Sequence, residues 1–217
     1  MSFDEFAEMK VIVFGGSGFL GSHIVDELSE RGFEVVILDR KKSPWKKEHQ
    51  KMVIGDFLEQ ELVEKTIRGA NYVYHFGGIA DIEESRQKPI EAVDTNVLGT
   101  MKLLKAAANE QIDRFIYAST MYVYSDRGGF YRSTKQASED IICSYNEKYG
   151  IEYVMLRYGT IYGPGAQKWN SMRKYIEQIL ENSKVDYIGT GEEIREYIHV
   201  NDAAQLSIEA LSDSYRN

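Results

Sequence analysis

The sequence contains a single cysteine, Cys143, so no disulfide can form within the chain. This cysteine and the four histidines do not fall at the spacing that a structural zinc site requires. No apolar run approaches the roughly 18 residues of a membrane span, and residues 1–8 are acidic where a secretory signal would be basic. These absences predict a metal-free protein that does not enter a membrane and works in the reducing cytoplasm.

An excess of positive charge is also lacking. The 217 residues include 26 lysines and arginines against 34 aspartates and glutamates, a formal net charge of -8. A protein that neutralises the phosphates of a nucleic acid needs a basic surface, so we expect no nucleic-acid partner. The length and the 43% hydrophobic content are typical of one globular domain, or of one domain with a small second lobe.

Short apolar runs alternate along the chain with longer stretches of helical periodicity. Leu20, Ile24 and Leu28 share one helix face, and a long helix is predicted from Ile90 to Leu104. Runs that are apolar throughout are typical of strands buried on both faces. The alternation predicts an α/β fold with a doubly wound, Rossmann-type parallel sheet. The predicted strands are residues 10–14, 34–38, 52–54, 72–75, 114–117 and 153–156.

The pattern becomes looser in the last quarter of the chain. We predict a cofactor-binding domain over residues 1–164 and a partial substrate-binding lobe with a return helix over residues 165–217. Because the chain stops at Asn217, we expect this small lobe to be incomplete. Its predicted elements are a helix near residues 169–181, a strand at residues 186–188 and a closing helix at residues 201–211.

A glycine-rich loop directly follows the first predicted strand. Gly15, Gly18 and Gly21 leave room for a pyrophosphate on the backbone N–H groups of a helix N-terminus. Asp39 ends the second predicted strand, 18 residues after Gly21, and suits a ribose 2′-hydroxyl. This acid favours NAD over NADP as the cofactor, although two basic residues follow it. The alternative is a structural glycine turn and an exposed aspartate.

A second group of reactive residues lies further along the chain. Tyr131 and Lys135 are four residues apart, so they share a helix face, and Thr120 follows the fifth predicted strand. To act as a base, the phenol needs its pKa lowered from about 10 to about 7, roughly 4 kcal/mol. The Lys135 ammonium and an oxidised nicotinamide both favour the phenolate, and the Thr120 hydroxyl can orient an alcohol. The alternative is an ordinary surface helix.

Seven stretches of the sequence together resemble the extended short-chain dehydrogenase/reductases, and specifically the NAD-dependent epimerase/dehydratase family. The resemblance covers nearly the whole chain. It implies the same doubly wound fold and an enzyme that transfers hydride between NAD and a secondary alcohol of a nucleotide sugar. The matching stretches are residues 14–23, 74–78, 96–100, 115–124, 131–135, 156–165 and 195–200.

The resemblance also implies roles for individual residues. Thr120, Tyr131 and Lys135 would be catalytic, with Ser119 as the alternative to Thr120. Ser119, Thr160 and Arg195 would contact substrate, and the guanidinium fork of Arg195 suits a diphosphate. The implied cofactor-binding residues are Gly15, Gly18, Phe19, Leu20, Gly21, Asp39, Arg40, Asp56, Phe57, Phe76, Gly77, Gly78, Asn96, Tyr131, Lys135 and Tyr158.

The sequence departs from the family pattern beside Thr120. Dehydratases of this type place Asp-Glu next, whereas this chain has Met121 and Tyr122, which cannot shuttle a proton as a carboxylate does. We therefore predict epimerase chemistry. Thr120 and Tyr131 are only 11 residues apart, which implies a more open pocket, and Thr160 stands where the family has asparagine.

Two other functions fit the same residues. A dehydrogenase or reductase of a small carbonyl compound would use the same triad and make Arg195 structural. A dinucleotide-binding module would hold the cofactor without turnover, but it has no need of Thr120, Tyr131 and Lys135 together, so we favour the enzyme. The helix beginning at Ile90 and the helix carrying Tyr131 resemble those that pair family members into homodimers; alternatively, each covers only its own sheet.

Overall fold

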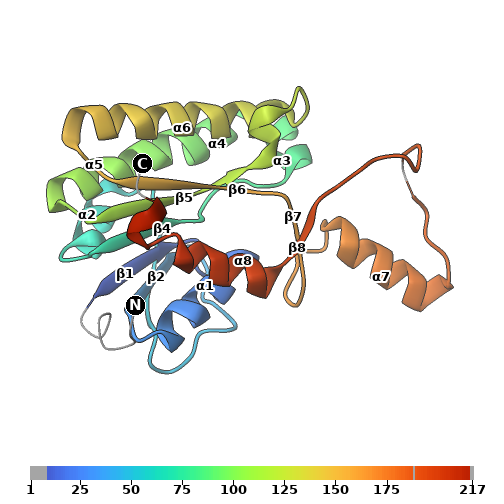
Figure 1. Ribbon diagram of the computed structural model, residues 1–217, viewed down its shortest axis with the longest axis horizontal. Coiled ribbons are helices and arrows are strands. Elements are labelled where there is room, and N and C mark those ends of the chain that lie inside the picture. The colour runs from blue at the N-terminus through green and yellow to red at the C-terminus, as the bar shows by residue number, and fades with distance from the viewer. Residues whose placement is uncertain (1–8, 188, 216–217) are drawn as a thin grey trace.

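A six-stranded parallel sheet runs through the middle of the molecule, with helices on both faces (Figure 1). The computed structural model describes residues 9–187 and 189–215. The strand order, β3-β2-β1-β4-β5-β6, is that of a doubly wound sheet, which confirms the predicted fold class. The strands are β1 (Lys10–Phe14), β2 (Glu34–Asp39), β3 (Lys51–Ile54), β4 (Tyr72–His75), β5 (Arg114–Thr120) and β6 (Tyr153–Tyr158).

The helices lie between and after these strands, and the helix predicted from Ile90 includes a π-helical turn. A π-helical turn separates α4 from α5, and the Asn96 carbonyl in this turn accepts hydrogen bonds from the Thr100 and Ser138 hydroxyls. The helices are α1 (Phe19–Glu30), α2 (Gln60–Ile67), α3 (Ile82–Gln87), α4 (Pro89–Val93), η2 (Asp94–Leu98), α5 (Gly99–Glu110), η3 (Met121–Tyr124), α6 (Gly129–Tyr149), α7 (Ser171–Asn182), α8 (Val200–Glu209) and η4 (Asp213–Tyr215).

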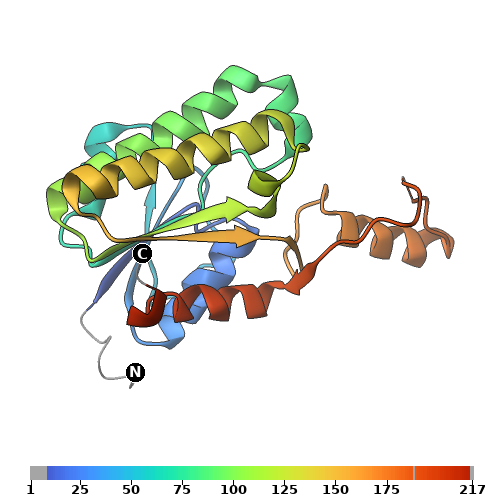
Figure 2. The same cartoon turned by 45° about the horizontal axis from the view of Figure 1, so that its top comes forward.

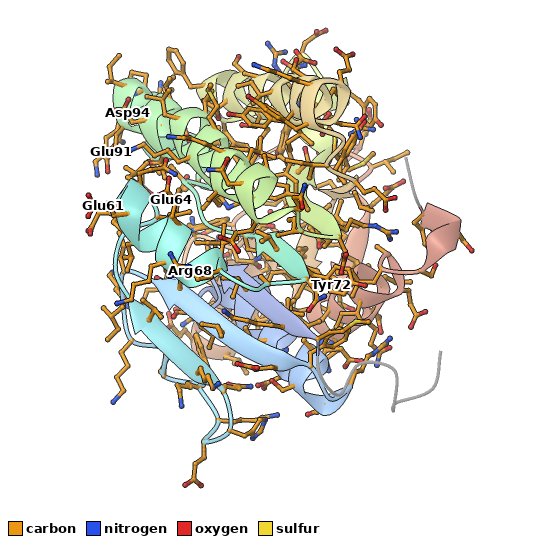
Figure 3. All side chains as sticks on the ribbon, turned by 90° about the vertical axis from the view of Figure 1, so that its left-hand side faces the viewer. Glu61, Glu64, Arg68, Tyr72, Glu91 and Asp94 are labelled. Carbon is orange, nitrogen blue, oxygen red and sulfur yellow. The ribbon has the colours of Figure 1, made fainter. Side chains whose placement is uncertain are left out.

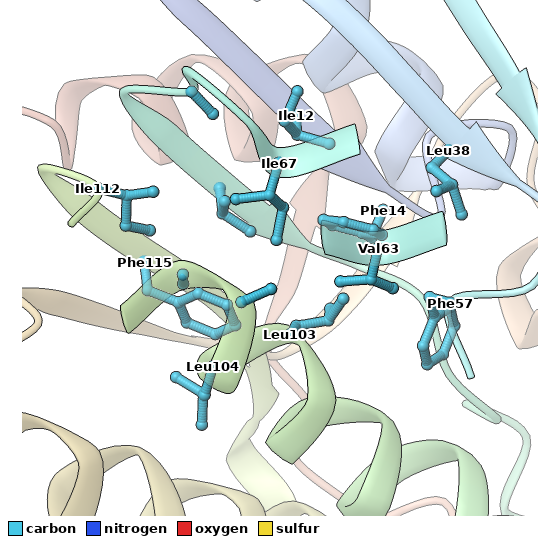
Figure 4. Close-up of a cluster of buried hydrophobic side chains, with 14 of the residues drawn as sticks. Ile12, Phe14, Leu38, Phe57, Val63, Ile67, Leu103, Leu104, Ile112 and Phe115 are labelled. Carbon is cyan, nitrogen blue, oxygen red and sulfur yellow. The ribbon is translucent and has the colours of Figure 1, made fainter. Parts of the chain in front are cut away.

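Neighbouring residues of each central strand point to opposite faces of the sheet and fill two separate cores. Ile12 and Phe14 of β1 belong to the core beneath α2, α5 and α6 (Figure 4). Val11 and Val13 belong to the core beneath α1 and α8. All four side chains are fully buried, which explains why β1 is an unbroken apolar run in the sequence.

The chain leaves the main body after β6 and then returns to it. The strands β7 (Thr160–Tyr162) and β8 (Tyr197–His199) pair in parallel, while α7 and the segment after it project away from the sheet (Figures 1 and 2). The return helix α8 packs against α1 and contributes Ala204 and Ile208 to the core.

The strand predicted at residues 186–188 is wrong for its first two residues. Asp186 and Tyr187 lie in no strand, and Ile188 lies outside the described residues. Asp186 is exposed, and its backbone N–H donates to the Gln178 side chain instead of to a neighbouring strand. Tyr187 is also exposed, so burial does not stabilise an extended conformation at these two residues. The strand of this region is β8, which is paired with β7.

Acidic side chains project from the helices at one side of the molecule (Figure 3). Glu61 and Glu64 belong to α2, Glu91 to α4 and Asp94 to the π-helical turn η2. These residues contribute to the formal net charge of -8. Within the two described ranges, the structure has no helix that is both long and apolar enough to cross a membrane.

Candidate active site

A cavity of about 830 Å³ lies at the carboxyl ends of the central strands. Gly15 follows β1, Phe76 follows β4 and Ser119 lies at the end of β5, and all three line the cavity. The connections that follow β1 and β4 lead to neighbouring strands in opposite directions, and such a switch point is where doubly wound sheets bind ligands. Two motifs that lie more than 100 residues apart, the glycine loop and the Tyr131–Lys135 pair, therefore meet in one cavity.

Most of the residues predicted from the sequence line this cavity. Asp56 and Asn96 do not. Asp56 accepts the Leu58 backbone N–H at 2.9 Å, and Asn96 is buried behind the turn that contains Gly77 and Gly78. The predicted residues that line the cavity are Gly15, Gly18, Phe19, Leu20, Gly21, Asp39, Arg40, Phe57, Phe76, Gly77, Gly78, Ser119, Thr120, Tyr131, Lys135, Tyr158, Thr160 and Arg195.

Other lining residues were not predicted from the sequence. Some directly adjoin a predicted motif, so their position in the chain could have indicated them. Those in residues 167–174 belong to no motif, and they lie between β7 and the first turn of α7, where the chain has left the central sheet. The additional lining residues are Leu38, Ala80, Asp81, Ile82, Glu83, Thr95, Ala118, Tyr122, Gly159, Ile161, Gln167, Trp169, Asn170, Ser171 and Lys174.

The glycine loop is closely packed and leaves its helix end suited to an anion. Gly15 has a φ of +79°, and a Cβ placed on it would lie 2.5 Å from the Gly77 nitrogen. A Cβ on Gly21 would meet the Gly15 carbonyl oxygen. Among the described residues, no side chain caps the N-terminus of α1, and its first turn has no acidic residue. The loop therefore fits a pyrophosphate group resting on the helix N-terminus.

Asp39 is fixed beside this loop by two backbone N–H groups. Its Oδ2 atom accepts from Ser17 at 3.0 Å, and its Oδ1 atom accepts from Lys41 at 3.2 Å. The Ser17 hydroxyl in turn donates to the Lys41 carbonyl at 3.0 Å. The carboxylate is thereby held at the end of β2, where the cavity begins, in a position that suits a ribose hydroxyl.

Asn96 supports the opposite side of the cavity from behind. Its side-chain oxygen accepts the Ile79 N–H at 2.8 Å, and its amide donates to the Ile79 carbonyl and to the Thr134 hydroxyl, both at 3.0 Å. These bonds join the glycine turn after β4 to α6. Tyr158 is also anchored, because its hydroxyl lies 2.7 Å from the Ser207 hydroxyl of α8.

Thr120, Tyr131 and Lys135 lie together on the cavity wall. Tyr131 is in the first turn of α6, and the ring of Tyr122 packs edge-on against it with centroids 6.4 Å apart. The Lys135 ammonium donates to the Ala118 carbonyl at 2.7 Å and lies 6.0 Å from the centre of the Tyr131 ring. The arrangement presents a phenol, a hydroxyl and an ammonium to one ligand.

Burial dominates the acid–base properties of this pair. It raises the pKa of Tyr131 to about 12, against a smaller lowering by a hydrogen bond with Thr120. It lowers the pKa of Lys135 to about 8, and the Glu139 carboxylate opposes this change. Lys135 is not among the groups that shift the Tyr131 pKa in this arrangement, in which its ammonium donates to the Ala118 carbonyl.

The structure distinguishes the two adjacent hydroxyls at the end of β5. The Ser119 hydroxyl donates to Glu139 at 2.5 Å, whereas Thr120 interacts with Tyr131. Thr120 is therefore the hydroxyl placed to act with the phenol. This geometry supports Thr120, and not the alternative Ser119, as the hydroxyl that acts with Tyr131. The Ser119 hydroxyl is bound to the Glu139 carboxylate instead.

Two basic side chains line the cavity on the side of the C-terminal segment. Arg195 lies shortly before β8, and Lys174 lies on α7. Both side chains are exposed. Together they give this end of the cavity a positive charge that suits a phosphate-bearing substrate.

A sheet of this topology, with its glycine loop and a Tyr-x-x-x-Lys pair facing one cavity, places the protein among the short-chain dehydrogenase/reductases. The family model described as "NAD dependent epimerase/dehydratase family" matches residues 11–216. The chain belongs to this family of enzymes.

Individual relatives agree with this assignment. A putative UDP-glucose 4-epimerase of Methanocaldococcus jannaschii is 30% identical in an alignment of 223 positions, which covers 93% of this chain and 73% of that protein. The UDP-glucose 4-epimerase of Thermotoga maritima, solved with UDP-glucose, superimposes with a TM-score of 0.88 at 26% identity and covers 94% and 74% of the two chains. The Thermus thermophilus UDP-glucose 4-epimerase, solved with NAD, gives a TM-score of 0.84 at 28% identity, with the same coverage.

Proposed function

We propose that this protein epimerises a secondary alcohol of a nucleotide sugar with NAD as its cofactor. The observation that carries the proposal is the meeting of the glycine loop with Thr120, Tyr131 and Lys135 in one cavity. A sugar nucleotide substrate is supported by the UDP-glucose bound to the Thermotoga maritima relative and by Arg195 and Lys174 at the cavity end. In a panel of UDP- and dTDP-sugars, we expect at least one to raise the melting temperature of the NAD-loaded protein.

The residues of the cavity fit NAD. Gly15, Gly18 and Gly21 would hold its pyrophosphate, Asp39 a ribose hydroxyl, and Tyr131 and Lys135 the nicotinamide end. NAD⁺ supplies a hydride acceptor and a positive charge. The positive charge matters for Tyr131, because burial, only partly opposed by the hydrogen bond with Thr120, raises the pKa of its phenol to about 12.

The side chains have separate roles in the proposed reaction. Thr120 orients the substrate hydroxyl, and Tyr131 removes its proton as the carbon is oxidised and returns a proton as it is reduced. Lys135 stabilises the phenolate and binds the Ala118 carbonyl, which fixes the end of β5 against α6.

Epimerisation is favoured over dehydration by the residues after Thr120. A dehydratase must also move a proton to the departing hydroxyl, a task suited to a carboxylic acid. The two residues after Thr120 are Met121 and Tyr122, and neither side chain has a carboxyl group. Met121 is 41% exposed, and Tyr122 packs on Tyr131. The alternative of a dehydrogenase for a small carbonyl compound would not need the cationic pair Arg195 and Lys174.

We infer that NAD binds more tightly than NADP. The Asp39 carboxylate is held by the Ser17 and Lys41 N–H groups at the cavity edge, where it would repel a 2′-phosphate. Calorimetry is expected to give at least about tenfold tighter binding of NAD, equivalent to roughly 1.4 kcal/mol. In Asp39→Asn the preference should fall. Equal affinities for the two dinucleotides in the wild type would contradict the inference.

Arg195 is expected to bind the diphosphate of the substrate. We expect Arg195→Gln to weaken UDP binding to the NAD-loaded protein by about 10- to 100-fold, because charge-assisted hydrogen bonds contribute roughly 1.5–3 kcal/mol. Arg68→Gln is the matched control, since Arg68 is also exposed but does not line the cavity. Isothermal titration with UDP measures the change; equal affinity in Arg195→Gln and the wild type would make Arg195 structural.

We also propose that the protein forms a homodimer through α4, η2 and α5. Ile90, Val93 and Met101 are apolar but exposed by 75%, 40% and 37%, and α5 lies beside α6 at the top of Figure 1. Light scattering is expected to give twice the chain mass, and Ile90→Glu to give a monomer. Ile194→Glu, at a residue 97% exposed on the projecting segment, should remain dimeric. A monomeric wild type at micromolar concentration would contradict the proposal.

We assign the cofactor and the substrate to the two parts of the chain that were predicted from the sequence. Residues 1–164 would bind the cofactor and carry the catalytic side chains, and residues 165–217 would contribute substrate contacts before α8 returns to the main body. Lys174 and Arg195, which line the cavity from the second part, support this division.

A further inference from the structure

A buried carboxylate lies next to the proposed catalytic residues, yet the proposed reaction does not use it. Glu139 is on α6, one helical turn after Lys135, and is only 8% exposed. Its Oε1 atom accepts from the Ser119 hydroxyl at 2.5 Å and from Arg157 Nε at 2.9 Å. Its Oε2 atom accepts from Arg157 Nη2 at 2.8 Å. Both oxygens are thus engaged by charge-assisted hydrogen bonds.

These bonds join four elements around the cavity wall. Ser119 is at the end of β5, Glu139 on α6 and Arg157 on β6. Arg157 also donates to the hydroxyl of Tyr124, the last residue of η3, and its guanidinium group lies 4.9 Å from the centre of that ring. Ser119 immediately precedes Thr120. Glu139 therefore connects the strand that carries Thr120 with the helix that carries Tyr131 and Lys135.

We propose that Glu139 is a positioning residue for the reaction: it fixes Thr120 against the Tyr131–Lys135 pair through Ser119 and Arg157, and it places a negative charge one helical turn after Lys135. This inference rests on the function proposed above. It assigns to Glu139 an electrostatic role in addition to its hydrogen bonds.

The charged and titratable groups around Lys135 support this role. The ring of Tyr117 on β5 lies 4.7 Å from the ammonium, and Tyr131 lies on its own helix. From β4, His75 carries no positive charge near neutral pH, because burial, with a smaller contribution from Lys135, lowers its pKa to about 3. Arg157 on β6 is bound to Glu139. Glu139 is the group that raises the pKa of Lys135 against the effect of burial.

The sign of the effect follows from these charges. Burial lowers the pKa of Lys135 to about 8, so the ammonium is close to losing its proton at physiological pH. Replacing the Glu139 carboxylate by a neutral amide should lower this pKa further. Removing the Arg157 cation should have the opposite effect, because Glu139 would then act on Lys135 without partial neutralisation. If Glu139 had only a structural role, the two substitutions would not shift the Lys135 pKa in opposite directions.

The test is the titration of Lys135 in the full chain, followed by NMR of lysine labelled with ¹³C at Cε. The Lys135 signal is identified by its loss in Lys135→Met. We expect Glu139→Gln to lower the titration midpoint by about one pH unit and Arg157→Gln to raise it. The pH dependence of kcat/KM should shift in the same directions. Ser119→Ala, which keeps both charges, should leave the midpoint unchanged.

The outcomes separate this inference from the proposed function. Midpoints that stay unchanged, or that move in the same direction in Glu139→Gln and Arg157→Gln, would overturn the role of Glu139 even in an active enzyme. Opposite shifts in a protein that epimerises no sugar nucleotide would instead overturn the proposed function. If Glu139→Gln does not fold, the midpoint of Arg157→Gln decides alone: a rise supports the inference and an unchanged or lower value contradicts it.

Discussion

Replacing Tyr131 by phenylalanine is expected to lower kcat by about 10²- to 10⁴-fold, the usual contribution of a positioned acid or base. The substitution removes the hydroxyl that interacts with Thr120 but keeps the ring that packs against Tyr122. The affinity for NAD should therefore change little. Turnover of a sugar nucleotide measures the first effect and calorimetric titration with NAD the second.

A second tyrosine of the same helix provides the control. Tyr149, the last residue of α6, is 53% exposed and does not line the cavity. Tyr149→Phe removes the same atom from the same helix and should keep wild-type kcat. Wild-type turnover in Tyr131→Phe would remove the phenol from the mechanism, whatever the protein binds.

Replacing Gly15 by alanine is expected to weaken NAD binding by more than about 100-fold. The new Cβ would lie 2.5 Å from the Gly77 backbone nitrogen, and both residues line the cavity. The loop and the glycine turn must separate, which disrupts hydrogen bonds to a charged pyrophosphate that contribute roughly 1.5–3 kcal/mol each. Calorimetric titration with NAD measures the loss.

Gly69→Ala is the control that distinguishes the effect of the Cβ clash at Gly15 from the effect of a positive φ alone. Gly69 has a φ of +69°, close to the +79° of Gly15, but a Cβ placed on it meets no atom within 4 Å. The control should therefore lose about 1 kcal/mol of stability from the left-handed conformation and keep its NAD affinity. A folded Gly15→Ala protein with wild-type affinity for NAD would show that the glycine loop does not hold the cofactor.

The central fold could be predicted because its inner strands are buried on both faces of the sheet. The unbroken apolar runs of β1 and β2 reflect two cores, one on each face of the sheet. The C-terminal segment offered no such pattern. β7 and β8 are each three residues long and are stabilised by pairing with each other across more than 30 residues of chain, so their positions depend on tertiary contacts. The strand predicted at residues 186–188 fails for the same reason at Asp186 and Tyr187.

The sequence predicted those parts of the candidate site in which the reaction or the ligand requires a particular residue type at a particular spacing. The glycines of the phosphate loop and the Tyr131–Lys135 pair meet this condition, and they share the cavity. The hydrogen-bond partners of the charged side chains, and the pKa shifts that they cause, could not be predicted in the same way. The spacing of Tyr131 and Lys135 does not reveal that the ammonium binds the Ala118 carbonyl, nor that Ser119 and Arg157 both bind Glu139.

The most direct test of the proposed function is the incubation of the protein and NAD with UDP-glucose and a panel of other UDP- and dTDP-sugars, followed by proton NMR of the anomeric signals. An epimerase should convert at least one sugar nucleotide into a mixture of two epimers, and the same mixture should form from either epimer without net accumulation of NADH. Stoichiometric NADH with an oxidised product would instead identify a dehydrogenase. Binding of NAD without conversion of any sugar nucleotide would contradict the proposed epimerase.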